Sequence, residues 1–337
     1  MEIPHPGPRI GRFRRGRAPD TGETPVADRR VENLAFYCIT VAIWGSTWIA
    51  IKFQLGEVDP AVSIAYRFAI ASALLLGYCA LRRLPFRFSL RDHGFIALQG
   101  VLLFALNYWL FYLAELYLAS GLVAVVFSTM VVLNILNGAW LLGTPIEPRV
   151  VAGAALGSVG IAGVFWPEMA AFDGGGQGIR GLLLCLGATL LASLGNITSA
   201  RNQGRGLPVV QTNALGMGYG AAAMALLALG SGSTFGFPIT LGYVASLAYL
   251  SLFGSIVAFG CYLTLLGRVG AGRAAYATLL FPVVALGIST AVEGYTWTAS
   301  GGVGVLLILA GNVLALSRPR ASGASRHLAG ATGRVRT

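Results

Sequence analysis

Residues 119–142 read ASGLVAVVFSTMVVLNILNGAWLL, a run of 24 residues that contains no charged side chain. At 1.5 Å of rise per residue, a helix over this run would be roughly 36 Å long, which is more than the hydrocarbon thickness of a bilayer. A helix also satisfies its own backbone hydrogen bonds, which lipid cannot do. The run therefore predicts a helix that crosses a membrane.

Similar apolar runs recur along the whole chain. Its 337 residues are 55% hydrophobic and 11% charged, with a mean hydropathy of +0.71, whereas soluble domains carry about 25% charged residues. We therefore predict an all-α integral membrane protein with ten transmembrane helices. The predicted spans are residues 34–53, 61–81, 94–115, 119–142, 149–166, 179–200, 208–229, 241–264, 272–291 and 298–317.

The basic residues are distributed unevenly between these spans. The net charge of +11 comes from 23 arginines and one lysine, Lys52. With the N-terminus inside the cell, 21 of these 24 residues lie on the cytoplasmic side, Lys52 and Arg180 lie outside, and Arg67 lies within a span. This asymmetry predicts an inner (cytoplasmic) membrane protein with both termini in the cytoplasm. The positive charge is then expected to meet anionic lipids rather than nucleic acid.

The two halves of the chain resemble each other at an offset of about 150 residues. Gly45-Ser46 corresponds to Gly195-Asn196, and Tyr112-Leu113 corresponds to Tyr262-Leu263. Further pairs keep nearly the same offset: Pro60 with Pro208, Ala124 with Ala274, Ser128 with Thr278, and Gly153 with Gly302. A repeat of five helices, an odd number, must insert its second copy upside down. We therefore predict two inverted five-helix repeats with a substrate site between them.

Several motifs occur in a fixed order along the spans. They are Trp44–Lys52 (WGSTWIAIK), Arg67, Ser120–Ser128 (SGLVAVVFS), Arg273–Ala277 (RAAYA), Pro282, Glu293, Gly302 and Gly311. This ordered set resembles the drug/metabolite transporter superfamily, and within it the EamA-type ten-helix family. The departures lie in the first repeat, which lacks the helix-4 proline near Val131 and has Thr144 where a glutamate is expected. The resemblance implies a carrier of small organic metabolites, often an exporter.

This organisation divides the chain into five parts. Residues 1–33 and 318–337 are predicted to be basic, disordered cytoplasmic segments, because they are rich in arginine and lack apolar runs. Residues 34–166 form the first EamA-like repeat and residues 179–317 the second, joined by an outer loop at 167–178.

Polar and aromatic side chains within the spans are the candidates for substrate binding. Each has a competing structural role in packing aromatic rings or in joining helices by hydrogen bonds. Tyr108, Tyr112 and Glu115 are spaced to share one helix face, which would suit a water-filled cavity. Pro282 is expected to bend its helix. The binding candidates are Trp44, Trp48, Arg67, Tyr108, Tyr112, Asn134, Asn137, Ser193, Asn196 and Tyr276.

Charged residues in or near the spans are few. Arg67 is expected either to bind an anionic substrate group or pair with Glu115, or else to extend to the outer interface or tether a neighbouring helix. Lys52, Glu115 and Glu293 lie near the outer helix ends and are candidates for coupling or for structural ion pairs.

Two other classes of protein compete with a carrier. An enzyme is disfavoured because the spans contain no histidine and no recognisable catalytic motif, and a receptor or scaffold that transports nothing is the main alternative. The four cysteines and three histidines show no metal-binding or disulfide spacing, so we expect no metal and no cofactor. The sequence does not indicate an oligomeric state.

The predicted topology can be tested with reporter tags. Tags on the N-terminus and on the C-terminus are both expected to report the cytoplasm, because an even number of spans returns the chain to the side from which it started. An outer location for either tag would contradict the ten-helix arrangement.

Overall fold

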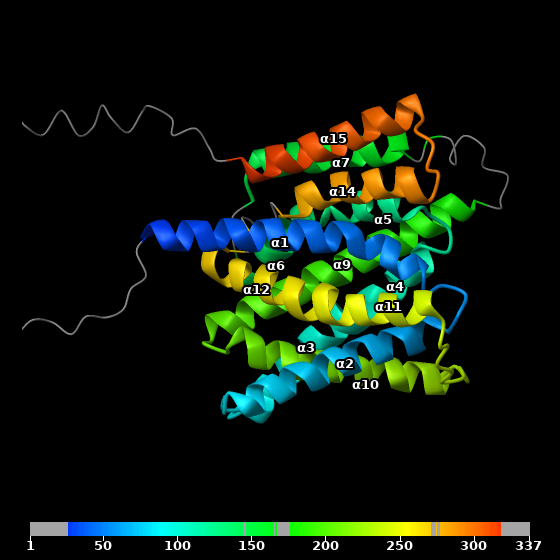
Figure 1. Cartoon of the computed structure of the whole chain (residues 1–337). Helices are drawn as coiled ribbons and strands as arrows, with labels where there is room; N and C mark the ends of the chain where they lie inside the picture. Colours follow the sequence, from blue (N-terminus) through cyan, green and yellow to red (C-terminus); the bar gives the residue numbers. More distant parts are fainter. Residues whose placement is uncertain are drawn as a thin grey trace, which may run out of the picture.

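The computed structural model of the protein describes residues 26–143, 146–164, 166, 176–270, 274 and 277–317. These residues form a bundle of long helices that run roughly side by side (Figure 1). The start of α1 and the end of α15 lie at the same end of the bundle, which we call the terminal end. The other end is called the distal end.

Ten helical spans cross the bundle between these two ends. Two of them, the third and the eighth, contain a π-helical segment (η1 and η2), and the fourth is broken into two helices. The spans are α1 (Val26–Lys52), α2 (Pro60–Leu81), α3–η1–α4 (Leu90–Val101, Leu102–Leu106, Asn107–Ala114), α5–α6 (Ser120–Phe127, Met130–Leu142), α7 (Pro148–Val164), α9 (Gln177–Gly204), α10 (Val209–Gly230), α11–η2–α12 (Leu241–Tyr249, Leu250–Val257, Ala258–Val269), α14 (Ala277–Val292) and α15 (Ala299–Leu316).

Length and composition confirm the all-α membrane fold. Among the described residues, seven helices are long and apolar enough to cross a membrane, and three shorter apolar helices complete the ten spans. The short ones lie within α7, α14 and α15. The fold class and approximate helix count predicted from hydropathy are therefore correct.

The first helix begins earlier than predicted. It starts at Val26 rather than residue 34, so residues 26–33 are helical, although the sequence led us to expect disorder up to residue 33. Arg268 on α12 explains part of this extension, because it donates to the Glu32 carboxylate (2.9 Å) and to the Asn33 side chain (3.2 Å). Its guanidinium also lies 5.1 Å from the ring centroid of Phe36.

Many of the helix contacts are made between the two repeats. Corresponding helices of the two repeats pair with each other: α2 lies against α10, and α7 against α15 (Figure 1). The first helix of each repeat packs on helices of the other repeat: α9 packs on α4 and α6 of the first repeat, and α1 packs on α12 and α14 of the second. This reciprocal packing is what two inverted five-helix repeats related by a two-fold axis are expected to produce.

Glycines allow α7 and α15 to approach each other closely. A Cβ atom built on Gly160 would lie 2.6 Å from the carbonyl oxygen of Gly304, and one built on Gly304 would lie 2.5 Å from that of Gly160. Gly153 and Gly311 meet in the same way one or two turns along. Small residues that admit backbone contact are a common basis of helix association in lipid.

These contacts predict the effect of adding one methyl group. Gly160→Ala should destabilise the protein by about 1–3 kcal/mol, because the new carbon would overlap the backbone of α15. Gly157→Ala is the matched control, since Gly157 lies on the same helix and a Cβ built on it meets no atom within 4 Å. Thermal unfolding of the purified protein in detergent measures both. Equal melting temperatures for the two variants would contradict this account of the interface.

Candidate functional site

A cavity lies at the centre of the bundle, between the two repeats. It is bounded by α1, the η1–α4 region, α5, α6, α9 and α12. Half of its fourteen lining side chains are aromatic and none is charged. The lining residues are Trp44, Thr47, Trp48, Ile51, Leu103, Asn107, Tyr108, Phe111, Phe127, Met130, Ala192, Asn196, Phe259 and Tyr262.

Trp44 and Trp48 organise the aromatic wall. They lie one turn apart on α1 and are both almost fully buried. Trp44 packs against Phe259 and Tyr262 of α12 at centroid distances of 5.0 and 4.9 Å. Trp48 packs against Phe111 of α4 at 5.2 Å in an edge-to-face arrangement. The wall therefore joins helices of both repeats through a single turn of α1.

Three polar atoms of the cavity lining are buried without a hydrogen-bond partner among the described residues. They are Nε1 of Trp48, Oδ1 of Asn107 and Oδ1 of Asn196. The Asn196 amide nitrogen, by contrast, donates to Sδ of Met130 (3.2 Å) and to the Tyr262 hydroxyl (3.4 Å). Buried polar atoms are normally paired, so one donor and two acceptors remain for a bound solute or for water.

Arg67 lies behind the cavity rather than in its lining. The residue is 1% exposed, so it does not reach the outer interface. Its Nε donates to the Ser255 hydroxyl in η2 (2.9 Å), and its guanidinium lies 4.4 Å from the ring centroid of Tyr108, which lines the cavity. No ion pair between Arg67 and Glu115 occurs in the described part of the chain. Of the alternatives expected for Arg67, pairing with Glu115 and extension to the outer interface are therefore wrong, whereas the bond to Ser255 tethers α2 to a neighbouring helix.

The other candidates on the third span do not share one environment. Tyr108 lines the cavity, whereas the Tyr112 hydroxyl donates to Oε1 of Gln54 (2.7 Å), outside the cavity lining. Glu115 lies at the distal end. Of the three, only Tyr108 lines the cavity, so the common cavity, one of the two roles expected for this helix face, does not occur.

Among the asparagine and serine candidates, some line the cavity and others join two helices by a hydrogen bond. Asn196 lines the cavity, but Asn137 donates to the Ser193 hydroxyl (2.9 Å), which joins α6 to α9. Asn134 is buried on α6 and is not part of the cavity lining. Pro282 lies inside α14 as predicted. Tyr276 lies outside the described residues.

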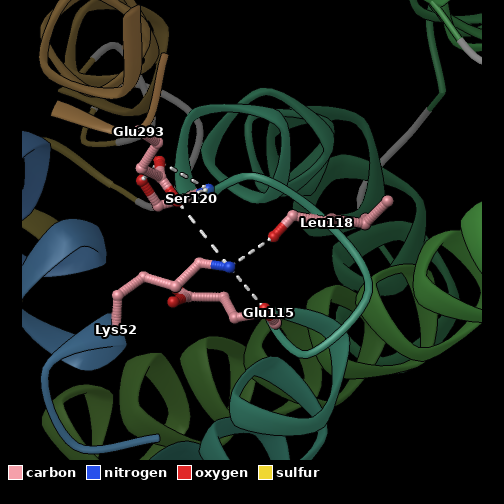
Figure 2. Close-up of polar contacts among 5 residues, drawn as sticks. All are labelled: Lys52, Glu115, Leu118, Ser120 and Glu293. Carbon is pink, nitrogen blue, oxygen red and sulfur yellow. Dashed lines mark hydrogen bonds and ion pairs between the residues drawn. The ribbon is translucent and has the colours of Figure 1, made fainter. Parts of the chain in front are cut away.

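A charged cluster holds three segments together at the distal end (Figure 2). Lys52, the last residue of α1, donates to the backbone carbonyls of Glu115 (2.5 Å) and Leu118 (2.8 Å) and lies 3.7 Å from the Glu293 carboxylate. Glu293, just after α14, accepts hydrogen bonds from the Ser120 backbone amide (3.0 Å) and from its hydroxyl. We call Lys52, Glu293 and Ser120 the distal latch.

The match to known proteins follows this two-repeat architecture. A family model described as the EamA-like transporter family matches residues 33–166 and 179–317. These two stretches contain all ten spans apart from the beginning of α1 and of α9. The chain belongs to the EamA-like transporter family.

Relatives of this EamA-like transporter extend over most of its length. It is 29% identical over 289 residues to the "Uncharacterized inner membrane transporter YedA" of Escherichia coli K12, covering 82% of this chain and 90% of that protein. It is 26% identical over 280 residues to the "Probable amino-acid metabolite efflux pump" of Salmonella typhimurium, covering 81% and 91%. One solved crystal structure shares the fold, with a TM-score of 0.63 at 19% identity over 86% of this chain and 100% of that one.

The family and the apolar helices together establish the general role. The protein is a multi-pass inner-membrane transporter, and its substrate is a small molecule. Relatives are named as transporters rather than as enzymes.

Sequence reasoning missed several residues of the transporter's cavity and latch. Asn107, Phe259 and Tyr262 line the cavity, and Ser120 completes the latch. Asn107 carried a signal, since it is a polar side chain in the middle of an apolar span. Phe259 and Tyr262 carried no such signal in the sequence, because an aromatic ring in a membrane helix can equally well pack against other helices or face lipid.

The environment of Arg67 predicts a separation of stability from transport. A buried cation without a carboxylate partner is costly, so Arg67→Met should leave the melting temperature unchanged or raise it. It should nevertheless lower the transport rate about tenfold or more, since Arg67 positions Tyr108 at the cavity.

Arg83→Met is the control, because Arg83 is exposed in the loop after α2. Thermal unfolding and solute flux are measured on the same preparations. A strong loss of stability in Arg67→Met, or equal transport rates in the two variants, would show that Arg67 has only a structural role.

Proposed function

We propose that the transporter moves a small organic metabolite, such as an amino acid or a related solute, by alternating access through the central cavity. The observation that carries this proposal is the group of three unpartnered polar atoms on Trp48, Asn107 and Asn196 within an aromatic cavity. Ligand sites typically combine an apolar lining with a few polar groups that set orientation.

The cavity chemistry limits the class of solute. Two amide oxygens can accept from an ammonium, amine or hydroxyl group, and the indole N–H of Trp48 can donate to a carboxylate or carbonyl. The aromatic rings suit an apolar or flat portion of the same molecule. A strongly charged solute, such as a phosphate ester, fits poorly because the described lining contains no charged side chain.

The arrangement of the repeats supports alternating access. Helix α1 packs on α12 and α14, and α9 packs on α4 and α6, so each half of the cavity is built from both repeats. Inverted repeats can exchange their conformations, which gives two related states that open to opposite sides. A receptor or scaffold would not require a central cavity that both repeats enclose.

Direction and orientation are proposed on separate grounds. Export is supported by the relative whose name describes an amino-acid metabolite efflux pump. The cytoplasmic location of the terminal end is supported by its arginines, among them Arg201, Arg205 and Arg268, which would face anionic lipid there. We expect the solute to leave the protein chemically unchanged.

A screen followed by flux measurement tests the function. Metabolites whose cellular levels differ between overexpressing and deleted cells identify the solute. Its flux is then measured in proteoliposomes. Asn107→Leu and Asn196→Leu should each reduce the flux at limiting solute by about tenfold, because one hydrogen bond in the cavity is worth about 1–1.5 kcal/mol.

Asn213→Leu is the matched control for this test. Asn213 is another buried asparagine with an unpartnered amide oxygen, but it lies on α10 and does not line the cavity. Equal losses in all three variants would indicate a general loss of folding. Absence of flux for every solute found in the screen would contradict transport through this cavity.

A further inference from the structure

Glu115 is a buried acid beside the distal latch whose carboxyl group makes no hydrogen bond within the described chain. The residue is 1% exposed, and neither carboxyl oxygen has a hydrogen-bond partner among the described residues. Its neighbour Glu293, by contrast, accepts from Ser120 and lies 3.7 Å from Lys52. Figure 2 shows the Glu115 side chain reaching towards the Lys52 chain while its backbone carbonyl accepts from the ammonium.

An ionised carboxylate is very unfavourable when it is buried without a hydrogen bond or a counter-ion. In the conformation observed here, the Lys52 ammonium is directed at two carbonyls and at Glu293 rather than at the Glu115 carboxyl. Glu115 is therefore expected to hold its proton in this state. Losing that proton would create a second anion that competes with Glu293 for the same ammonium.

The other titratable groups around Glu115 do not offer it a cation. On its own span, the Tyr112 hydroxyl is bonded to Gln54. On α9, the Cys185 thiol donates to the Val123 carbonyl (3.6 Å). On α2, Arg67 is directed at Ser255. Within the described chain, the charged groups that act on the Glu115 carboxyl are Lys52 from α1 and Glu293 from the end of α14.

The corresponding contact at the terminal end is neutral. Gln203, near the end of α9, donates to the Leu263 carbonyl of α12 (3.1 Å), as Lys52 near the end of α1 donates to carbonyls after α4. These two contacts join helices that are equivalent in the two repeats. An amide carries no charge, so a change in protonation would act on the distal contact and not on this one.

We propose that Glu115 is a proton-binding site that controls the distal latch, so that release of its proton opens this end of the transporter. This inference rests on the proposed alternating-access function. The O–H bond of the Glu115 carboxyl breaks, and its proton passes to water at the distal end. The resulting carboxylate draws the Lys52 ammonium away from Glu293, and Glu293 then holds the start of α5 only through Ser120. Helix α14 is thereby freed to move away from α1.

Distance measurements by electron paramagnetic resonance test this proposal without any solute. Spin labels are placed at Phe53 and Val292, which are exposed next to Lys52 of α1 and next to Glu293 after α14, in full-length protein in lipid nanodiscs with the four native cysteines replaced. As the pH rises from about 5 to about 9, a longer-distance population should grow several-fold. Glu115→Gln should show the short distance at every pH, because its amide remains neutral.

Two further variants complete the experiment. Lys52→Met should show the longer distance at every pH, since Glu293 then has no ammonium to hold. Glu57→Gln is the control, because Glu57 is an exposed acid in the loop after α1 at the same end, and it should respond like the unmodified sequence.

A response to pH in Glu115→Gln equal to that of the unmodified sequence, or no response in the unmodified sequence, would overturn the proton site. Neither result would affect the transport proposal, which the flux measurement decides separately.

Discussion

Hydrocarbon offers no hydrogen-bond partners, so the backbone groups of a membrane span must be satisfied within the protein. Helices satisfy most of them, and at three irregular points of the bundle side chains donate to backbone carbonyls. At the break in the fourth span, the Asn312 amide donates to the Ser128 carbonyl (3.1 Å). In η2, the Ser255 hydroxyl donates to the Leu250 carbonyl (2.9 Å). At the distal end, the Lys52 ammonium donates to the backbone carbonyls of Glu115 and Leu118, which follow α4.

The break in the fourth span shows how the repeats keep one shape with different residues. In the second repeat, Pro282 lies inside α14 and removes a backbone donor. The first repeat has no proline near Val131, yet its span is interrupted between Phe127 and Met130. Asn312 of α15 supports this interruption from outside the helix. This interruption was not predicted from the sequence, because the fourth span contains no proline.

The spans, their inverted pairing and the fold class followed from sequence because each depends on local composition or on a fixed offset. The cavity did not, because it depends on which face of each helix points inward. Trp44, Trp48, Tyr108 and Asn196 were predicted among ten binding candidates and do line it, whereas Asn107 was missed. Periodicity places residues on one helix face but does not identify the neighbours of that face. Tyr108 and Tyr112, one turn apart, both interact with Arg67, yet only Tyr108 lines the cavity.

Unpartnered polar atoms in the cavity and the unpartnered carboxyl group of Glu115 beside the latch have a common physical meaning. Each leaves the observed conformation less stable than a fully satisfied bundle would be, since a buried polar group without a partner is costly. A solute that pairs with Trp48, Asn107 and Asn196 relieves that cost in the conformation that encloses it, and so stabilises that conformation relative to the open ones. Differential affinity of this kind is what allows a ligand to shift a conformational equilibrium. A bundle whose interior was fully satisfied would be more stable, but binding would then do less to change its shape.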